Sequence, residues 1–120
     1  MTGKILALVA LVALPFGWFL LAGSPAASAG GGGDAEAHRL VTAGALLLDV
    51  RTQGEFADGH VPGAVNIPVG ELAGRLSALG PKDRAIVVYC HSGGRSARAA
   101  GRLKEAGYAT VHDMGPMSRW

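Results

Sequence analysis

The sequence predicts a small α/β domain of three layers, in which a parallel sheet of four to five strands lies between helices. Apolar runs of strand length alternate with segments of helical spacing from Asp34 onward. The connections between them are short, which favours parallel strands joined by helices on both faces of the sheet. Two of the runs, residues 45–50 and 85–89, are continuously apolar, as buried parallel strands usually are.

In the first half of this domain, single residues mark where predicted elements begin or end. Asp34 has a side chain suited to capping a helix, and Gly44 is a typical helix stop. Pro68 stops a short strand. In chain order we expect a helix over 35–42, a strand over 45–50, one helical turn over 53–57, a loop over 59–63 and a strand over 64–67.

The second half contains the clearest strand and the clearest helix. Apolar residues three or four positions apart predict a helix over 69–79, which Gly80 and Pro81 end. The strand at 85–89 is followed by a helix over 96–106, for which Gly107 is the stop. A last strand is expected over about 110–113.

Residues 1–29 have the three parts of a secretory signal peptide. Lys4 gives a positive start, residues 5–22 are uncharged and strongly apolar, and Ala27-Ser28-Ala29 matches a small-residue cleavage site. The competing interpretation is an uncleaved anchor, although a proline and a glycine inside the apolar run weaken it. We therefore expect a periplasmic or extracellular protein, or a membrane-anchored domain outside the cytoplasm.

Residues 30–33 are glycines that we interpret as a linker, and residues 34–120 as one domain with a modest core. The formal net charge of +2, to which Lys4 contributes, is too small to indicate a nucleic-acid partner. Membrane contact is expected only if the leader is not cleaved.

Cys90 is the one cysteine of the chain, so no internal disulfide can form although export implies an oxidising compartment. It follows an apolar strand and precedes a Gly93-Gly94 turn that opens a helix. Backbone N–H groups and a helix N-terminus therefore converge on the sulfur, which favours the thiolate. We expect a reactive nucleophile that is open to small anions.

Three separated motifs resemble those of the rhodanese family of sulfurtransferases, and most of all its small, exported, single-domain members. The motifs are Leu48–Arg51, then Glu55-Phe56 followed by Gly59–Pro68, then Cys90–Ser96. They occur in the family's order, and the likeness covers residues 34–120. The resemblance implies a rhodanese-like α/β fold. A glycine run stands where the family usually has its first strand, which predicts a sheet trimmed to about four strands.

The resemblance also implies a ping-pong transfer of sulfur. The thiolate of Cys90 would attack the outer sulfur of thiosulfate or a similar donor, and cyanide or a thiol would then remove that sulfur from the cysteine persulfide. Glycine at 93 and 94 lets the backbone turn its N–H groups inward, and Ser96 is expected to cap the next helix and donate toward the sulfur. The expected active-site loop consists of His91, Ser92, Gly93, Gly94, Arg95 and Ser96.

The roles of the flanking residues stay open. Arg95 either binds an anionic donor or fixes the loop through carbonyl contacts. His91 either lines the mouth of the site or faces solvent. Asp49 and Arg51 are candidate supporting residues: we expect a structural role for Asp49, and for Arg51 an ion pair with Asp49 or Glu55 rather than a free positive charge.

Other functions compete with the enzyme. Cys90 can hand a persulfide to one dedicated protein partner, as a sulfur carrier or interaction module does. A non-catalytic scaffold is disfavoured, since inactive relatives generally lose the cysteine. A phosphatase-like activity is disfavoured because four residues separate Cys90 from Arg95, one fewer than in the related phosphatases. No cofactor or metal is expected, because one cysteine and four dispersed histidines lack paired ligand spacing.

The leader interpretation predicts the first residue of the exported protein. If residues 1–29 are a signal peptide, N-terminal sequencing of that protein should read Gly30 onward. A sequence that starts at Met1 would instead show that the leader is retained as an anchor.

Overall fold

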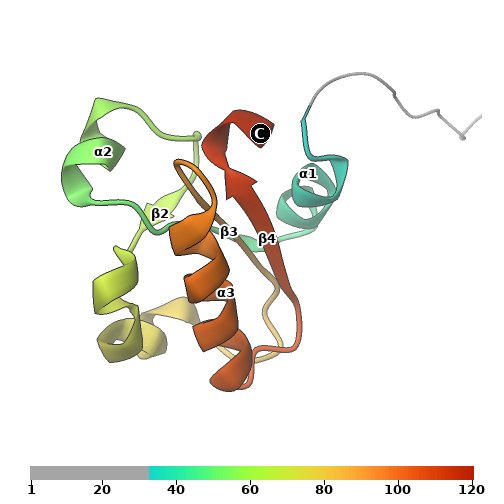
Figure 1. Ribbon diagram of the computed structural model, residues 1–120. Coiled ribbons are helices and arrows are strands. Elements are labelled where there is room, and N and C mark those ends of the chain that lie inside the picture. Colours follow the sequence, from blue (N-terminus) through green and yellow to red (C-terminus); the bar gives the residue numbers. More distant parts are fainter. Residues whose placement is uncertain (1–32) are drawn as a thin grey trace, which may run out of the picture. The chain divides into compact units, whose positions relative to one another are not determined.

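The computed structural model describes residues 33–120 of the chain (Figure 1). The predicted signal peptide, residues 1–29, and linker residues 30–32 lie outside the described residues. Between residues 33 and 120, no helix has the length and apolar character that crossing a membrane requires.

Four parallel strands form one sheet in the order β2-β1-β3-β4. Their bounds are Leu46–Asp49 for β1, Val65–Asn66 for β2, Ile86–Cys90 for β3 and Val111–Pro116 for β4. The two continuously apolar runs of the sequence are β1 and β3, which pair with each other at the centre and are buried along their whole length. The predicted parallel sheet is confirmed, with four strands.

Helices cover both faces of the sheet, as predicted. Their bounds are Ala35–Thr42 for α1, Gln53–Asp58 for α2, Val69–Leu79 for the 3₁₀ segment η2, Gly94–Glu105 for α3 and Met117–Arg119 for the short η3. Successive strand residues alternate between the faces, so Leu47 and Val87 pack with Ala37 of α1 on one side. Leu48 and Val88 pack with Leu72 of η2 and Leu103 of α3 on the other.

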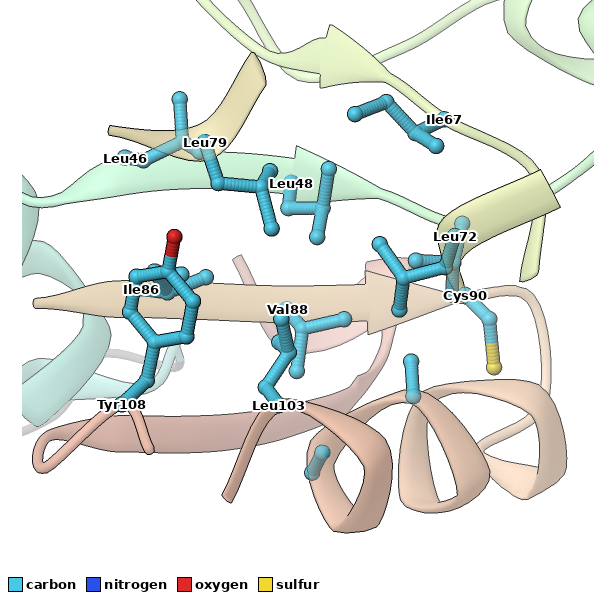
Figure 2. Packing of buried hydrophobic residues seen from close by; sticks show 13 residues of the cluster. Leu46, Leu48, Ile67, Leu72, Leu79, Ile86, Val88, Cys90, Leu103 and Tyr108 are labelled. Atoms are coloured by element: carbon cyan, nitrogen blue, oxygen red, sulfur yellow. The ribbon is translucent and has the colours of Figure 1, made fainter. Parts of the chain in front are cut away.

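The larger core cluster lies between β1, β3, η2 and α3 (Figure 2). Leu48, Val88, Leu72 and Leu103 meet at its centre, and Cys90 stands at the end of the cluster nearest the start of α3. The cysteine is therefore anchored at the end of a fully buried central strand, which gives it little freedom to move.

Two elements differ from the prediction in detail. The segment 69–79 forms a 3₁₀ helix interrupted at Arg75, whose φ of −126° is non-helical, rather than a continuous α-helix. Gly70 and Gly74 lower its α-helical propensity, while Leu72 and Leu79 are still buried on its inner side. Helix α3 begins at Gly94, two residues before the predicted start, because Gly93 serves as its N-cap.

Strand β4 is longer than the predicted 110–113 and contains a bulge. Val88 pairs with Asp113 and Tyr89 with Gly115, so Met114 is the extra residue. The bulge interrupts the alternation on which a sequence-based boundary relies. A hydrogen bond spans the extra residue: the amide of Gly115 donates to Oδ1 of Asp113 at 3.0 Å.

The first and last segments of the domain are fastened to each other. Asp34 caps α1 as predicted, accepting from the amide of Ala37 at 3.0 Å, and its other carboxylate oxygen lies 2.7 Å from Nε2 of His112 in β4. The ring of His38 stacks on Trp120 at 3.7 Å between centroids. Trp120 thus packs at the edge of the core against α1.

Tyr89 connects the sheet to the Gly/Pro-rich loop, and its replacement should be costly. Its buried hydroxyl accepts from the amide of Val61 at 3.1 Å. Tyr89→Phe leaves that buried N–H without a partner, so urea unfolding should show a loss of about 1–3 kcal/mol.

Tyr108→Phe is the matched control for this prediction. The hydroxyl of Tyr108 donates to the carbonyl of Gly80 at 2.6 Å, and Gly80 is exposed, so water can replace the lost donor. We expect this variant to lose no more than about 1 kcal/mol. Equal losses in the two variants would contradict the assignment of the Tyr89 cost to an orphaned amide.

Candidate active site

The carboxyl ends of β1 and β3 bring together the residues that the sequence singled out. Asp49 pairs in register with Tyr89, the residue before Cys90, so Asp49–Arg51 and Cys90 lie at the same edge of the sheet. Ligands of open parallel sheets bind beyond this edge. The loop that follows Cys90 leads directly into α3.

Main-chain N–H groups of this loop point toward the sulfur. Gly93 has a φ of +109°, a left-handed conformation that glycine adopts readily, and its amide donates to Sγ of Cys90 at 3.0 Å. Burial alone would raise the pKa of the Cys90 thiol. Hydrogen bonds from the Ser96 hydroxyl and from the amides of Ser96, Gly93 and Ser92 outweigh it, so that the pKa is lowered.

The accessibility of Cys90 differs from the sequence-based expectation of a thiol open to small anions. The residue is fully buried, with 0% of its surface exposed. Its carbon atoms belong to the core cluster, while the sulfur points away from Leu48 and Val88 toward the loop (Figure 2). The amides are thus arranged as expected, but the sulfur lies beneath the loop.

Ser96 plays a different part from the one expected for it. The N-cap of α3 is Gly93, and Ser96 is the third residue of the helix. Its buried hydroxyl donates to the carbonyl of Gly93 at 3.0 Å, which ties the first turn of the helix to the loop, and it also contributes to lowering the pKa of Cys90. The expected capping role is therefore wrong, and the hydroxyl proton is directed to the Gly93 carbonyl, while the hydroxyl still helps to lower the pKa of Cys90.

Asp49 and Arg51 form a buried pair. Nε and an Nη of Arg51 donate to the Asp49 carboxylate at distances from 2.7 to 3.1 Å, and both side chains are almost fully buried. The same guanidinium donates to the carbonyl of Gly59 at 2.7 Å and so holds the loop that follows α2. Arg51 is therefore an ion-pair partner of Asp49, one of the two partners expected for it, and the Asp49 carboxylate is occupied by this pair.

Arg95 is paired with Glu55, a contact that the sequence did not predict. Its two terminal nitrogens donate to the two carboxylate oxygens of Glu55 at 2.6 and 3.0 Å. These bonds from Arg95, with those from Thr52, lower the pKa of Glu55 to about 2. The capping box Thr52-x-x-Glu55 was visible in the sequence, but nothing in the sequence showed that its glutamate also meets the arginine of the loop.

The remaining loop residues face outward. His91, Ser92 and Gly94 are exposed, and Gly93 is half-buried. His60, in the loop that follows α2, makes a local hydrogen bond: its Nδ1 donates to the carbonyl of Phe56 at 2.9 Å. Within residues 33–120, no three His, Cys, Asp or Glu side chains are grouped as a metal site would require.

This geometry provides a nucleophile rather than an acid–base pair. A thiolate held by several N–H groups can attack an electrophilic sulfur, and the same groups can hold the negative charge of a bound sulfur atom. The nearby carboxylates of Asp49 and Glu55 are both engaged by arginines, which leaves neither free to act as a general base.

Comparison with known proteins identifies the family of this domain. The family model described as Rhodanese-like domain matches residues 34–120. The chain is 44% identical over 66 residues to a sulfurtransferase of Allochromatium vinosum, in an alignment that covers 55% of this chain and 61% of the relative. It is 41% identical over 73 residues to a putative sulfur carrier protein of Bacillus subtilis, covering 61% of this chain and 39% of that protein.

A solved structure agrees with the fold. The human single-domain sulfurtransferase superposes with a TM-score of 0.59 and 27% sequence identity, covering 76% of this chain and 93% of the human one. The alignments with the two bacterial relatives span less than two thirds of those proteins' own lengths. The fold and the family are thereby established for residues 34–120.

The hydroxyl of Ser96 should set the acidity of the cysteine. Because it stabilises the thiolate, Ser96→Ala should raise the pKa of Cys90 toward the ordinary thiol value. A pH titration of the ultraviolet thiolate absorbance measures this shift.

Ser92→Ala is the control, since Ser92 acts through its main-chain N–H, which alanine keeps. That variant should titrate like the unmodified protein. An unchanged pKa of Cys90 in Ser96→Ala would show that the amides alone hold the thiolate.

Proposed function

We propose that this chain, which belongs to the rhodanese-like domain family, is a sulfurtransferase that works through a persulfide on Cys90. The observation that supports this most directly is the amide of Gly93, which donates to Sγ at 3.0 Å beside the hydroxyl and amide of Ser96. Relatives named sulfurtransferase share the sequence pattern of the domain. The thiolate that these groups favour is the form that attacks sulfur.

The first half-reaction loads the cysteine. The Cys90 thiolate attacks the outer sulfur of thiosulfate or a similar donor; a new S–S bond forms, the S–S bond of the donor breaks, and sulfite leaves with the bonding electron pair. The product is a cysteine persulfide anion, so charge is conserved. The N–H groups of Gly93 and Ser96 that favoured the thiolate then stabilise the persulfide.

The second half-reaction releases the sulfur to cyanide or to a thiol. A nucleophilic acceptor attacks the outer sulfur of the persulfide, and Cys90 leaves as the thiolate that began the cycle. Because Cys90 is buried, donor and acceptor must reach it through the loop, whose residues His91 and Ser92 are exposed. We propose that a small displacement of this loop opens the path and that its return shields the persulfide from water.

A persulfide carrier that serves one protein partner is the second candidate. The similarity to a protein named as a putative sulfur carrier favours it, and both functions need the same loop. Turnover separates the two: an enzyme recycles with thiosulfate and cyanide, whereas a carrier forms a stable persulfide with negligible turnover of small molecules.

We propose that the domain acts outside the cytoplasm, either released after cleavage of residues 1–29 or held by them at the membrane. The proposal is supported by the charged start, apolar run and small-residue cleavage pattern of the leader. Protease protection of the domain in intact cells, lost when the outer barrier is opened, is the expected behaviour of an exported protein.

The persulfide can be detected directly. After exposure to thiosulfate, mass spectrometry should find a gain of one sulfur mass on the peptide that contains Cys90, and dithiothreitol should remove it. Cys90→Ser should show no gain and no transfer to cyanide, because a hydroxyl at this position is not ionised. Undiminished transfer in that variant would end the assignment.

A further inference from the structure

Glu55 is held in place from two sides. It is the third residue of α2, where its Oε1 accepts from the amide of Thr52 at 3.1 Å while the Thr52 hydroxyl accepts from its own amide. The same carboxylate accepts hydrogen bonds from both terminal nitrogens of Arg95 at 2.6 and 3.0 Å. The pair therefore joins α2 to the start of α3 across the candidate active site, with about a third of each side chain exposed.

The charge of the Arg95 guanidinium and the charge of the Cys90 thiolate act on each other. Arg95 is the second residue of α3, directly after the loop, and the charges of Glu55 and of the Cys90 thiolate both help to raise its pKa. The other arginine at this edge of the sheet, Arg51, is bound to Asp49. Both arginines thus have a carboxylate partner within the protein, and the group that donates to Sγ is the main-chain N–H of Gly93.

We propose that Glu55 is a positioning residue that determines donor specificity: by occupying the guanidinium of Arg95, it makes the site prefer sulfur donors with one negative charge over donors with two. This inference rests on the proposed function and names the substrate class of the same site. Singly charged thiosulfonates are donors of this class, and thiosulfate is the doubly charged comparison.

The preference follows from charge balance. Amide dipoles carry partial charges and suit a single negative charge, whereas a second charge needs a cation to offset it. Here that cation already has a carboxylate partner, so a dianion must either displace Glu55 or approach it against repulsion. Glu55, with a pKa of about 2, stays ionised throughout the neutral range in which transfer is assayed.

Two donors make the comparison sharp, because both deliver the same outer sulfur. Thiosulfate, a dianion, loses sulfite; methanethiosulfonate, a monoanion, loses methanesulfinate. In each reaction the thiolate forms one S–S bond, the donor's S–S bond breaks, and the leaving group takes the electron pair. The measured quantity is the ratio of kcat/KM for thiosulfate to kcat/KM for methanethiosulfonate, with cyanide as the common acceptor.

Two single variants should move this ratio in opposite directions. Glu55→Gln keeps an oxygen for the capping box and frees Arg95, so the ratio should rise roughly threefold or more, mainly through a lower KM for thiosulfate. Arg95→Gln leaves the carboxylate without its cation, so the ratio should fall by a similar factor. The free arginine of Glu55→Gln should also lower the pKa of Cys90 in a thiolate titration.

Glu105→Gln is the matched control. It removes the same charge from the exposed last residue of α3, about 15 Å along the helix from Arg95, and should leave the ratio unchanged. A purely structural ion pair would lower both activities together in both variants and leave the ratio constant, which would overturn the inference.

Failure of the inference and failure of the proposed function give different results. If the unmodified protein loads sulfur onto Cys90 from both donors but Glu55→Gln does not raise the ratio, the specificity role is wrong and the sulfurtransferase stands. If neither donor loads Cys90, the proposed function fails and the inference fails with it.

Discussion

Burial and hydrogen bonding have opposite effects on the ionisation of the Cys90 thiol, and the candidate active site depends on the balance between them. Cys90 ends the central strand, and its carbon atoms are part of the core, so burial works against ionisation. The loop reverses that effect because Gly93 adopts a φ of +109° and thereby turns its amide onto Sγ. A side chain at position 93 would strain this turn, and the sulfur would then be an ordinary buried thiol.

The carboxylates around the sulfur balance the arginines instead of taking part in proton transfer. Asp49 is buried at the carboxyl end of β1, where an unpaired charge would be very unfavourable. Arg51 neutralises this charge and also donates to the carbonyl of Gly59. Glu55 and Arg95 form a second such ion pair, in which both side chains are more exposed to solvent. The candidate active site therefore has an ion pair on each side, and the group that donates to the sulfur is a main-chain N–H.

The sequence was most informative where one residue type decides the local conformation. Asp34, Gly44 and Pro68 marked the ends of elements, and the apolar runs located β1 and β3. The bulge at Met114 escaped prediction because it arises from the pairing of β4 with β3. The break at Arg75 escaped it because the leucine spacing of residues 69–79 fits an α-helix, although Gly70 and Gly74 lower the propensity for one. The Glu55–Arg95 contact escaped prediction because the partners are 40 residues apart, and only the folded chain brings them together.

The same contacts couple the candidate active site to the stability of the fold. The folded-state pKa of Glu55, about 2, lies below its ordinary value of 4.5, so its stabilising contribution is complete above the ordinary value and is lost as the pH falls through about 2. The lowered pKa of Cys90 acts in the same direction at higher pH: its contribution is complete above the ordinary thiol value of 9.0 and fades as the pH falls through the folded-state pKa. The ionised forms that the loop needs for chemistry are thus also the forms that favour the folded state, so that acidification weakens both together.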